Sequence, residues 1–134
     1  MIVIVCVDDN NGMMFNKRRQ SKDRVLQKEI LRMIGKNKLW MNQYSKEQFA
    51  DDSEQIFINE DFLSKADSHD YCFIENVELS NRVNKIEKII RFKWNRIYPA
   101  DTYFSIDLSQ WILEESVDFK GYSHEKITKE IYKK

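Results

Sequence analysis

The sequence predicts an α/β domain: a mixed, mostly parallel β-sheet with flanking helices and a C-terminal antiparallel hairpin. Residues 1–7 form a continuous apolar run rich in β-branched side chains, which is typical of a central strand covered on both faces. Apolar residues then recur at helical spacing as far as residue 34, which predicts a helix after that strand. From residue 86 onward, aromatic-rich segments alternate polar and apolar residues, which is typical of antiparallel strands.

The chain has 134 residues and is 42% hydrophobic, which is enough for a single domain over residues 1–134 with one core. A domain of this size buries about two thirds of the surface of its extended chain, so it needs neither disulfides nor a structural metal. Cys6 and Cys72 lie in apolar runs and are expected as buried thiols, although a disulfide between them stays open. We therefore expect a reducing, cytoplasmic setting.

The charges of the chain balance. Lys plus Arg and Asp plus Glu both number 22, so the formal net charge at pH 7 is zero. No global field then draws the chain to nucleic acid or to an anionic membrane. The apolar residues 1–7 are too few for a membrane span, and no charged flank or cleavage site marks them as a signal.

The first helix is expected to begin after Ser21, which can act as its N-cap, and to end near Gly35. Asp23 falls in its first turn, where the helix dipole favours a negative charge. Its apolar face consists of Leu26, Ile30, Met33 and Ile34. Residues 39–44 are predicted as a second strand, and residues 45–48, Ser-Lys-Glu-Gln, have the spacing of a capping box that would start a short helix.

The middle of the chain continues this alternation. Residues 55–59 and 71–77 are predicted as strands with a turn at 67–70 between them, and residues 78–85 as a short helix.

Two long alternating segments follow. Residues 89–96 and 111–119 are predicted as antiparallel strands. The last segment, 123–132, stays open between a helix and a strand, because Ile127 and Ile131 fit one face of either.

Several of these segments resemble dihydrofolate reductases, in chain order. Residues 7–12, Val-Asp-Asp-Asn-Asn-Gly, resemble the turn after the first strand of that family, and Asp23 falls where its first helix carries the carboxylate that binds the pterin. Met41 and Ser45 resemble the Met and Thr of its Met-Gly-Arg-x-Thr pattern, and residues 100–104, Ala-Asp-Thr-Tyr-Phe, its Gly-Asp-Thr-x-Phe hairpin. Its last two strands are similar to Trp111-Ile112-Leu113, Phe119 and Tyr122-Ser123-His124.

This resemblance implies a ligand-binding cleft near Val5, Asp23 and Leu26. A carboxylate there can accept two parallel N–H donors from the edge of a pterin-like or purine-like ring. A simpler role for Asp23 is to stabilise the helix dipole by about 0.3 to 1 kcal/mol, and its charged neighbours Lys22 and Arg24 favour that role.

The cofactor site of the family is not matched. Dihydrofolate reductases hold the cofactor pyrophosphate against two adjacent glycines, but the three glycines of this chain are separate: Gly12, Gly35 and Gly121. Gln43 replaces the Arg that reads the adenosine phosphate, Phe92 replaces a Thr of the pterin site, and no Trp lies near Arg18. We therefore expect no cofactor and no hydride transfer, which needs its donor held within a fraction of an ångström.

One basic cluster is a candidate surface for nucleic acid: Lys17, Arg18 and Arg19, followed by Lys22 and Arg24. A solvated loop and first helical turn is the favoured interpretation, because no aromatic residue interleaves with the cluster and acidic residues lie close by.

Other catalytic and metal sites are not indicated. His69 and His124 lack the spacing of a zinc site, so no metal is predicted. Ser123 lies beside His124, but neighbours on a strand point apart, so no triad is indicated and no catalytic residue is assigned. A dispersed set of Ser, His and Asp or of Cys and His stays open.

Three functions remain. The preferred one is a non-catalytic or repurposed domain that binds a small heteroaromatic ligand or a protein partner in the cleft near Asp23. The second is a working enzyme, either a reductase with an altered cofactor site or a hydrolase or ribonuclease, as small bacterial chains of this kind are sometimes labelled. The third is RNA binding through residues 17–24. The oligomeric state stays open.

Overall fold

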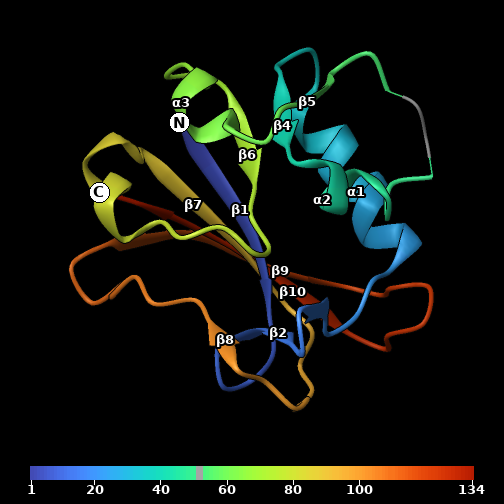
Figure 1. Cartoon of the computed structure of the whole chain (residues 1–134). Coiled ribbons are helices and arrows are strands. Elements are labelled where there is room, and N and C mark those ends of the chain that lie inside the picture. The colour runs from blue at the N-terminus through green and yellow to red at the C-terminus, as the bar shows by residue number, and fades with distance from the viewer. Residues whose placement is uncertain (51–52) are drawn as a thin grey trace.

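A computed structural model describes residues 1–50 and 53–134, which form a seven-stranded sheet, a small three-stranded sheet and short helices (Figure 1). The elements in chain order are β1 (Ile2–Val7), β2 (Gly12–Phe15), β3 (Arg18–Arg19), α1 (Arg24–Ile34), β4 (Leu39–Met41), α2 (Gln43–Lys46), β5 (Ile56–Ile58), α3 (Phe62–Lys65), β6 (Tyr71–Phe73), the 3₁₀ helix η1 (Ser80–Lys85), β7 (Lys88–Lys93), β8 (Thr102–Tyr103), β9 (Ile112–Phe119) and β10 (Ile127–Lys133).

The large sheet has the strand order β5-β4-β6-β1-β7-β10-β9. The strands from β5 to β7 pair in parallel, whereas β10 runs antiparallel to both β7 and β9. The predicted mixed, mostly parallel sheet with an antiparallel C-terminal hairpin is therefore confirmed. The open segment 123–132 contains a strand, since β10 needs an extended backbone to pair on both sides.

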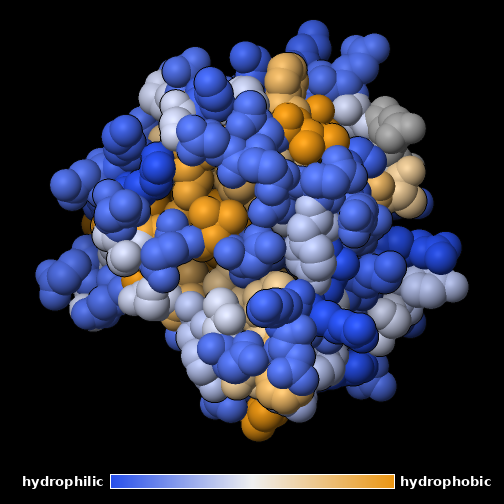
Figure 2. All heavy atoms as spheres, viewed as in Figure 1, coloured by the Kyte–Doolittle hydropathy of each residue, from blue (hydrophilic) through white to orange (hydrophobic). Residues whose placement is uncertain are grey.

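Two hydrophobic cores cover the two faces of this sheet. On one face Ile4 packs with Leu26 and Ile30 of α1. On the other face Val3 and Val5 pack with residues such as Met13, Phe62 and Phe104. Successive side chains of a strand point to opposite faces, so β1 contributes to both cores in turn. Figure 2 shows a largely polar surface with apolar side chains gathered over the region of β1, β6 and β7.

The start of the first helix differs from the prediction. Asp23, and not Ser21, is the N-cap of α1, and its carboxylate accepts hydrogen bonds from the backbone N–H groups of Val25 and Leu26. An ionised carboxylate suits this position because it meets both the free N–H groups and the positive end of the helix dipole.

The second helix also differs. The strand predicted over 39–44 ends at Met41, and Asn42 caps α2 by accepting from the Ser45 N–H at 3.0 Å. Ser45 lies buried inside this helix, so the capping box predicted to begin at Ser45 is wrong. The other predicted strands and the short helix near 78–85 are present with shorter bounds, whereas α3 was not predicted.

The segment 100–104 does not fold back on itself as a hairpin. Its strand β8 pairs with β2, which also pairs with β3, so the three form a separate small sheet. The β2–β3 turn consists of Asn16 and Lys17, both with positive φ (50° and 62°), as a tight hairpin turn requires. No helix in the described part of the chain is long and apolar enough to cross a membrane.

Candidate functional site

Asp23 lies in a closed network rather than in an open cleft. Besides its bonds to the start of α1, its carboxylate accepts from the backbone N–H groups of Tyr122 and Ser123, each at 2.9 Å. The residue is only 3% exposed. A Cβ atom at Gly121 would come within 2.7 Å of the Asp23 carboxylate, so the loop packs directly onto the acid.

His124 completes this network. Its Nδ1 lies 2.8 Å from the Asp23 carboxylate, and its Nε2 lies 3.0 Å from the Ser21 hydroxyl and 3.3 Å from the Tyr98 hydroxyl. The imidazole is 3% exposed and stacks on the Trp94 ring at a centroid distance of 4.5 Å. Because the network joins residues about 100 positions apart, it fastens the β9–β10 connection to the start of α1.

The surroundings of Asp23 keep its carboxylate ionised. Burial by itself raises the pKa of this acid, but hydrogen bonds from the Tyr122 backbone, the His124 side chain and the Ser123 backbone outweigh burial and hold the pKa well below its usual range. An ionised carboxylate only accepts hydrogen bonds, so His124 donates to it from Nδ1.

Of the three residues predicted to line a ligand cleft, Asp23 and Leu26 are neighbours at the start of α1, whereas Val5 lies on the other face of the sheet. Val5 belongs to the core on one face of the sheet, and Leu26 to the core on the other face. Val5 and Leu26 are fully buried. The Asp23 carboxylate already accepts hydrogen bonds from donors within the chain. Binding of a heteroaromatic ring by these three residues stays a prediction, and the hollows described below are lined by other residues.

A second buried acid, Glu75, lies just beyond the carboxyl end of β6. Its carboxylate accepts two hydrogen bonds from the Arg19 guanidinium, at 3.0 and 3.2 Å, and a third from the Ser45 hydroxyl at 2.8 Å. Burial would lower the pKa of the Arg19 guanidinium, but Glu75 outweighs burial and raises that pKa. The guanidinium also lies 4.2 Å from the centre of the Tyr44 ring. Arg19 and Glu75 therefore form an internal ion pair.

The predicted basic cluster is thereby divided. Lys17 and Arg18 are exposed on the β2–β3 hairpin, whereas Arg19 points inward to Glu75. Arg24 lies over the Tyr122 ring at 4.1 Å. Nucleic-acid binding through Lys17, Arg18 and Arg19 stays a prediction, with Arg19 already paired.

The N-terminus of α2 is also closed by internal partners. Asn42 caps the helix and donates from its side chain to the Asn76 side-chain oxygen at 2.8 Å. Where the chain leaves β6, residues 74–76 are Ile, Glu and Asn, and none of the three is a glycine. Their side chains hinder the close approach of a phosphate to the backbone at this point.

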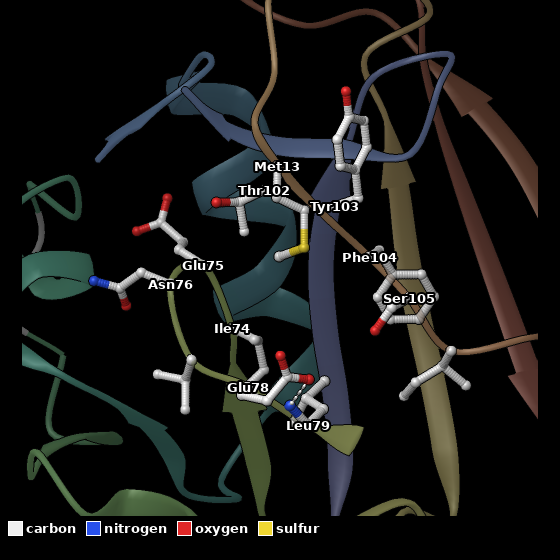
Figure 3. A pocket seen from close by; sticks show the side chains of 12 residues that line it. Met13, Ile74, Glu75, Asn76, Glu78, Leu79, Thr102, Tyr103, Phe104 and Ser105 are labelled. Carbon is white, nitrogen blue, oxygen red and sulfur yellow. Dashed lines mark hydrogen bonds between the residues drawn. The ribbon is translucent and has the colours of Figure 1, made fainter. Parts of the chain in front are cut away.

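A hollow of about 150 Å³ lies between this segment and β8 (Figure 3). In Figure 3, Glu75 and Asn76 border it on one side, and Met13, Thr102 and Phe104 border it on the other. Its lining residues are Met13, Ile74, Glu75, Asn76, Val77, Glu78, Leu79, Thr102, Tyr103, Phe104, Ser105 and Ile106. These described residues include two carboxylates and no Lys or Arg. We call this space the acidic hollow.

Two neighbouring hollows flank the β2–β3 hairpin. One adjoins the acidic hollow through Asn76 and Thr102 and also contains Lys17 and Asp101. The other, of about 470 Å³, we call the hairpin hollow; it is lined by Phe15, Asn16, Arg18, Arg19, Gln20, Tyr98 and Pro99. Among the described residues, no group of three or more His, Cys, Asp and Glu side chains is arranged to hold a metal ion.

Sequence reasoning missed both polar networks. Ser123 and His124 lie in a loop and not on a strand, so the argument that they point apart is wrong, and both contact Asp23. The serine that meets Nε2 is Ser21, distant in sequence, and no local pattern signals that pairing. The only hint of the Glu75 network was a charged residue directly after the apolar run 72–74.

Comparison with protein-family models finds none that matches this chain, and comparison with curated proteins finds no matching relative. Among solved structures, 234 chains match. One of these is dihydrofolate reductase from Enterococcus faecalis, complexed with NADP(H) and RAB-propyl; it matches with a TM-score of 0.71 over 98% of this chain and 94% of that chain, at 14% identity. The chain therefore has a dihydrofolate reductase-like fold, as its motifs predicted.

Proposed function

We propose that this chain, with its dihydrofolate reductase-like fold, is a repurposed domain that binds a small cationic heteroaromatic ligand and carries out no nicotinamide-dependent reduction. The observation that supports this most is the position of Glu75. In open α/β sheets, phosphates bind beyond the carboxyl ends of parallel strands, often at a helix N-terminus. Here the Glu75 carboxylate lies beyond β6 and accepts hydrogen bonds from Arg19 and Ser45, so these two donors are not available to an anionic cofactor.

The charge of the acidic hollow supports a cationic ligand. Glu78 lines it and has no cationic partner among its described lining residues, whereas Glu75, which also lines it, is paired with Arg19. Glu78 is exposed and accepts from the backbone N–H groups of Leu79 and Ser80 at 3.1 Å, which holds its carboxylate beside the opening. A pyrophosphate would be repelled there, whereas a protonated ring nitrogen would be attracted.

The size and walls of the hollow support a single ring. A cavity of about 150 Å³ lined by apolar side chains accepts a benzene-sized molecule. Met13, Ile74 and Phe104 offer apolar surface of this kind. The ligand class proposed is therefore one flat heteroaromatic ring that carries a positive charge.

Thermal unfolding tests this proposal with three probes. We expect 4-aminopyridine, which is protonated at neutral pH, to raise the Tm, whereas aniline and NADPH leave it unchanged. A ligand at 100 times its Kd adds about 2.7 kcal/mol to the free energy of unfolding. Stabilisation by NADPH, or equal stabilisation by aniline and 4-aminopyridine, would contradict the proposal.

A pair of variants locates the site. Glu78→Gln removes a charge that lines the hollow, and we expect it to reduce the shift caused by 4-aminopyridine. Glu87→Gln removes an exposed carboxylate outside the hollow and keeps the shift of the original chain. Equal losses in both variants would indicate unspecific attraction to negative charge.

A protein partner is the second candidate, favoured by β9. This strand forms an edge of the large sheet, and Ile112, Leu113 and Val117 are 56%, 49% and 43% exposed. An edge strand with apolar side chains can pair with a strand of another chain. The variant Leu113→Asp would abolish association through β9 in sedimentation experiments while leaving the binding of 4-aminopyridine unchanged.

A further inference from the structure

Ser21, His124 and Asp23 form a linear relay at the junction of α1 and the β9–β10 connection. The Asp23 carboxylate lies 2.8 Å from His124 Nδ1, and His124 Nε2 lies 3.0 Å from the Ser21 hydroxyl. An acid, an imidazole and a hydroxyl at these distances and in this order are the parts of a serine nucleophile with its general base. We infer that Ser21 is a nucleophile that accepts the acyl group of small aromatic carboxylic esters.

The proton positions needed for this chemistry follow from the partners of His124. Asp23 is an acceptor only, so Nδ1 carries a ring proton. General-base chemistry uses the neutral ring, in which Nε2 offers its lone pair to the Ser21 hydroxyl. The Tyr98 hydroxyl lies 3.3 Å from the same nitrogen.

The relay is rigid, as a general base must be to act in one geometry. Asp23 is held by four backbone N–H groups: those of Val25, Leu26, Tyr122 and Ser123. The His124 ring stacks on Trp94 with an angle of 27° between the planes and is almost fully buried. Ser21, in contrast, is half-buried, so the reacting atom lies nearer the surface than the groups that activate it.

The hairpin hollow gives the substrate a place beside the relay. Tyr98 lines this hollow of about 470 Å³ and reaches His124 Nε2, and Gln20, the neighbour of Ser21, lines it as well. Phe15 and Pro99 supply flat apolar surface for an aromatic group. The inner cavity that Ser21 lines measures about 10 Å³, which is no larger than one water molecule, so an ester does not reach the serine through that cavity.

A donor for the developing oxyanion lies next to the nucleophile. The backbone N–H of Lys22, the residue after Ser21, makes no hydrogen bond to any described residue. The N–H after the nucleophile is a usual donor to the tetrahedral intermediate of acyl transfer.

The reaction proceeds in two steps. In the first, the Ser21 oxygen attacks the ester carbonyl carbon while its proton passes to His124 Nε2; the bond from that carbon to the alcohol oxygen then breaks, and Nε2 returns the proton to the departing alkoxide. In the second, water attacks the acyl carbon and gives a proton to Nε2, which passes it to the Ser21 oxygen as the bond to the acyl group breaks. The products are a carboxylic acid and an alcohol.

Labelling with a phenyl-bearing fluorophosphonate tests the inference, because the serine oxygen displaces fluoride and keeps the phosphonyl group. We expect one label per chain, located on Ser21 by peptide mass spectrometry, and none on that peptide in Ser21→Ala. His124→Gln should slow labelling about 100-fold or more, the usual contribution of a general base. Ser109→Ala, an exposed serine outside the relay, keeps the original rate.

A purely structural role predicts a different result. Absence of the Ser21 label, or equal rates in the original chain and a His124→Gln variant shown by circular dichroism to be folded, would overturn the inference. Nitrogen chemical shifts of His124 give a second reading that does not depend on reactivity. A proton on Nδ1 with a bare Nε2 supports the nucleophile, and a proton on Nε2 overturns it.

Discussion

Two of the buried carboxylates, Asp23 and Glu75, differ in what neutralises them. Glu75 meets a guanidinium and a hydroxyl, so its charge is cancelled by a cation of the chain. Asp23 meets backbone N–H groups and an imidazole, and the second nitrogen of that imidazole lies next to the Ser21 hydroxyl. The ion pair of Glu75 with Arg19 satisfies both charges inside the fold. The hydrogen bond from His124 to Asp23 instead orients an imidazole whose other nitrogen can act as a base. The two networks are close neighbours, since Arg19, Ser21 and Glu75 line the same small inner cavity.

Removal of Asp23 is expected to have the largest effect. Asp23→Ala leaves several buried N–H donors without an acceptor and deletes the N-cap of α1, which together cost about 3 to 5 kcal/mol of the free energy of unfolding. Urea unfolding measures this loss. Asp9→Ala, which removes an exposed carboxylate in the β1–β2 turn, should change stability by less than about 0.5 kcal/mol. Similar losses of unfolding free energy in the two variants would show that the Asp23 network stabilises the fold no more than a surface carboxylate does.

Removal of Glu75 is expected to cost less but to change binding. Glu75→Ala leaves Arg19 partly buried without its carboxylate, a loss of about 2 to 3 kcal/mol. It also frees Arg19 and Ser45 for an anion. Inorganic phosphate should therefore raise the Tm of Glu75→Ala and leave that of the original chain unchanged. Equal shifts in both would show that Glu75 does not occupy the anion position.

Low pH should lower the free energy of unfolding, because it protonates buried carboxylates that accept hydrogen bonds from backbone N–H groups. Burial raises the pKa of Asp8, but N–H groups of Tyr98, Gly12 and Asn10 outweigh it, so the pKa of Asp8, like that of Asp23, is lowered in the fold. The unfolded chain then binds protons at a higher pH than the native chain, and stability falls as the pH drops from about 5 toward 2. Urea unfolding at several pH values should show a shallower fall for Asp8→Asn. An unchanged slope would contradict this origin.

Two glycines give the smallest effects and separate packing from backbone strain. Gly121→Ala puts a methyl group 2.7 Å from the Asp23 carboxylate and 2.8 Å from Ile127, and should cost about 1 to 3 kcal/mol. Gly35→Ala meets no neighbouring atom within 4 Å but has φ of +58°, and should cost about 1 kcal/mol. If only Gly121→Ala also lowers the rate of fluorophosphonate labelling, the loop positions the relay.

The sequence by itself determined the local elements. The apolar run at 1–7 required a strand covered on both faces, and the spacing of Leu26, Ile30 and Ile34 required a helix. These features depend on periodicity and residue size, which neighbours in the chain already express. The resemblance of motifs to a known family predicted the dihydrofolate reductase-like fold, and the structure confirms it.

Tertiary structure decided everything that depends on which residues meet. Most of the segment 123–132 is strand, from Ile127 onward, because β7 and β9 lie on the two sides of β10, although its own pattern fits a helix equally well. Asp23 is an N-cap and a partner of His124, and Arg19 is a partner of Glu75, because folding brings together residues separated by 101 and 56 positions. Hydrogen bonds between such distant side chains leave no periodic trace in the sequence, since each partner is chosen by the packing of whole elements.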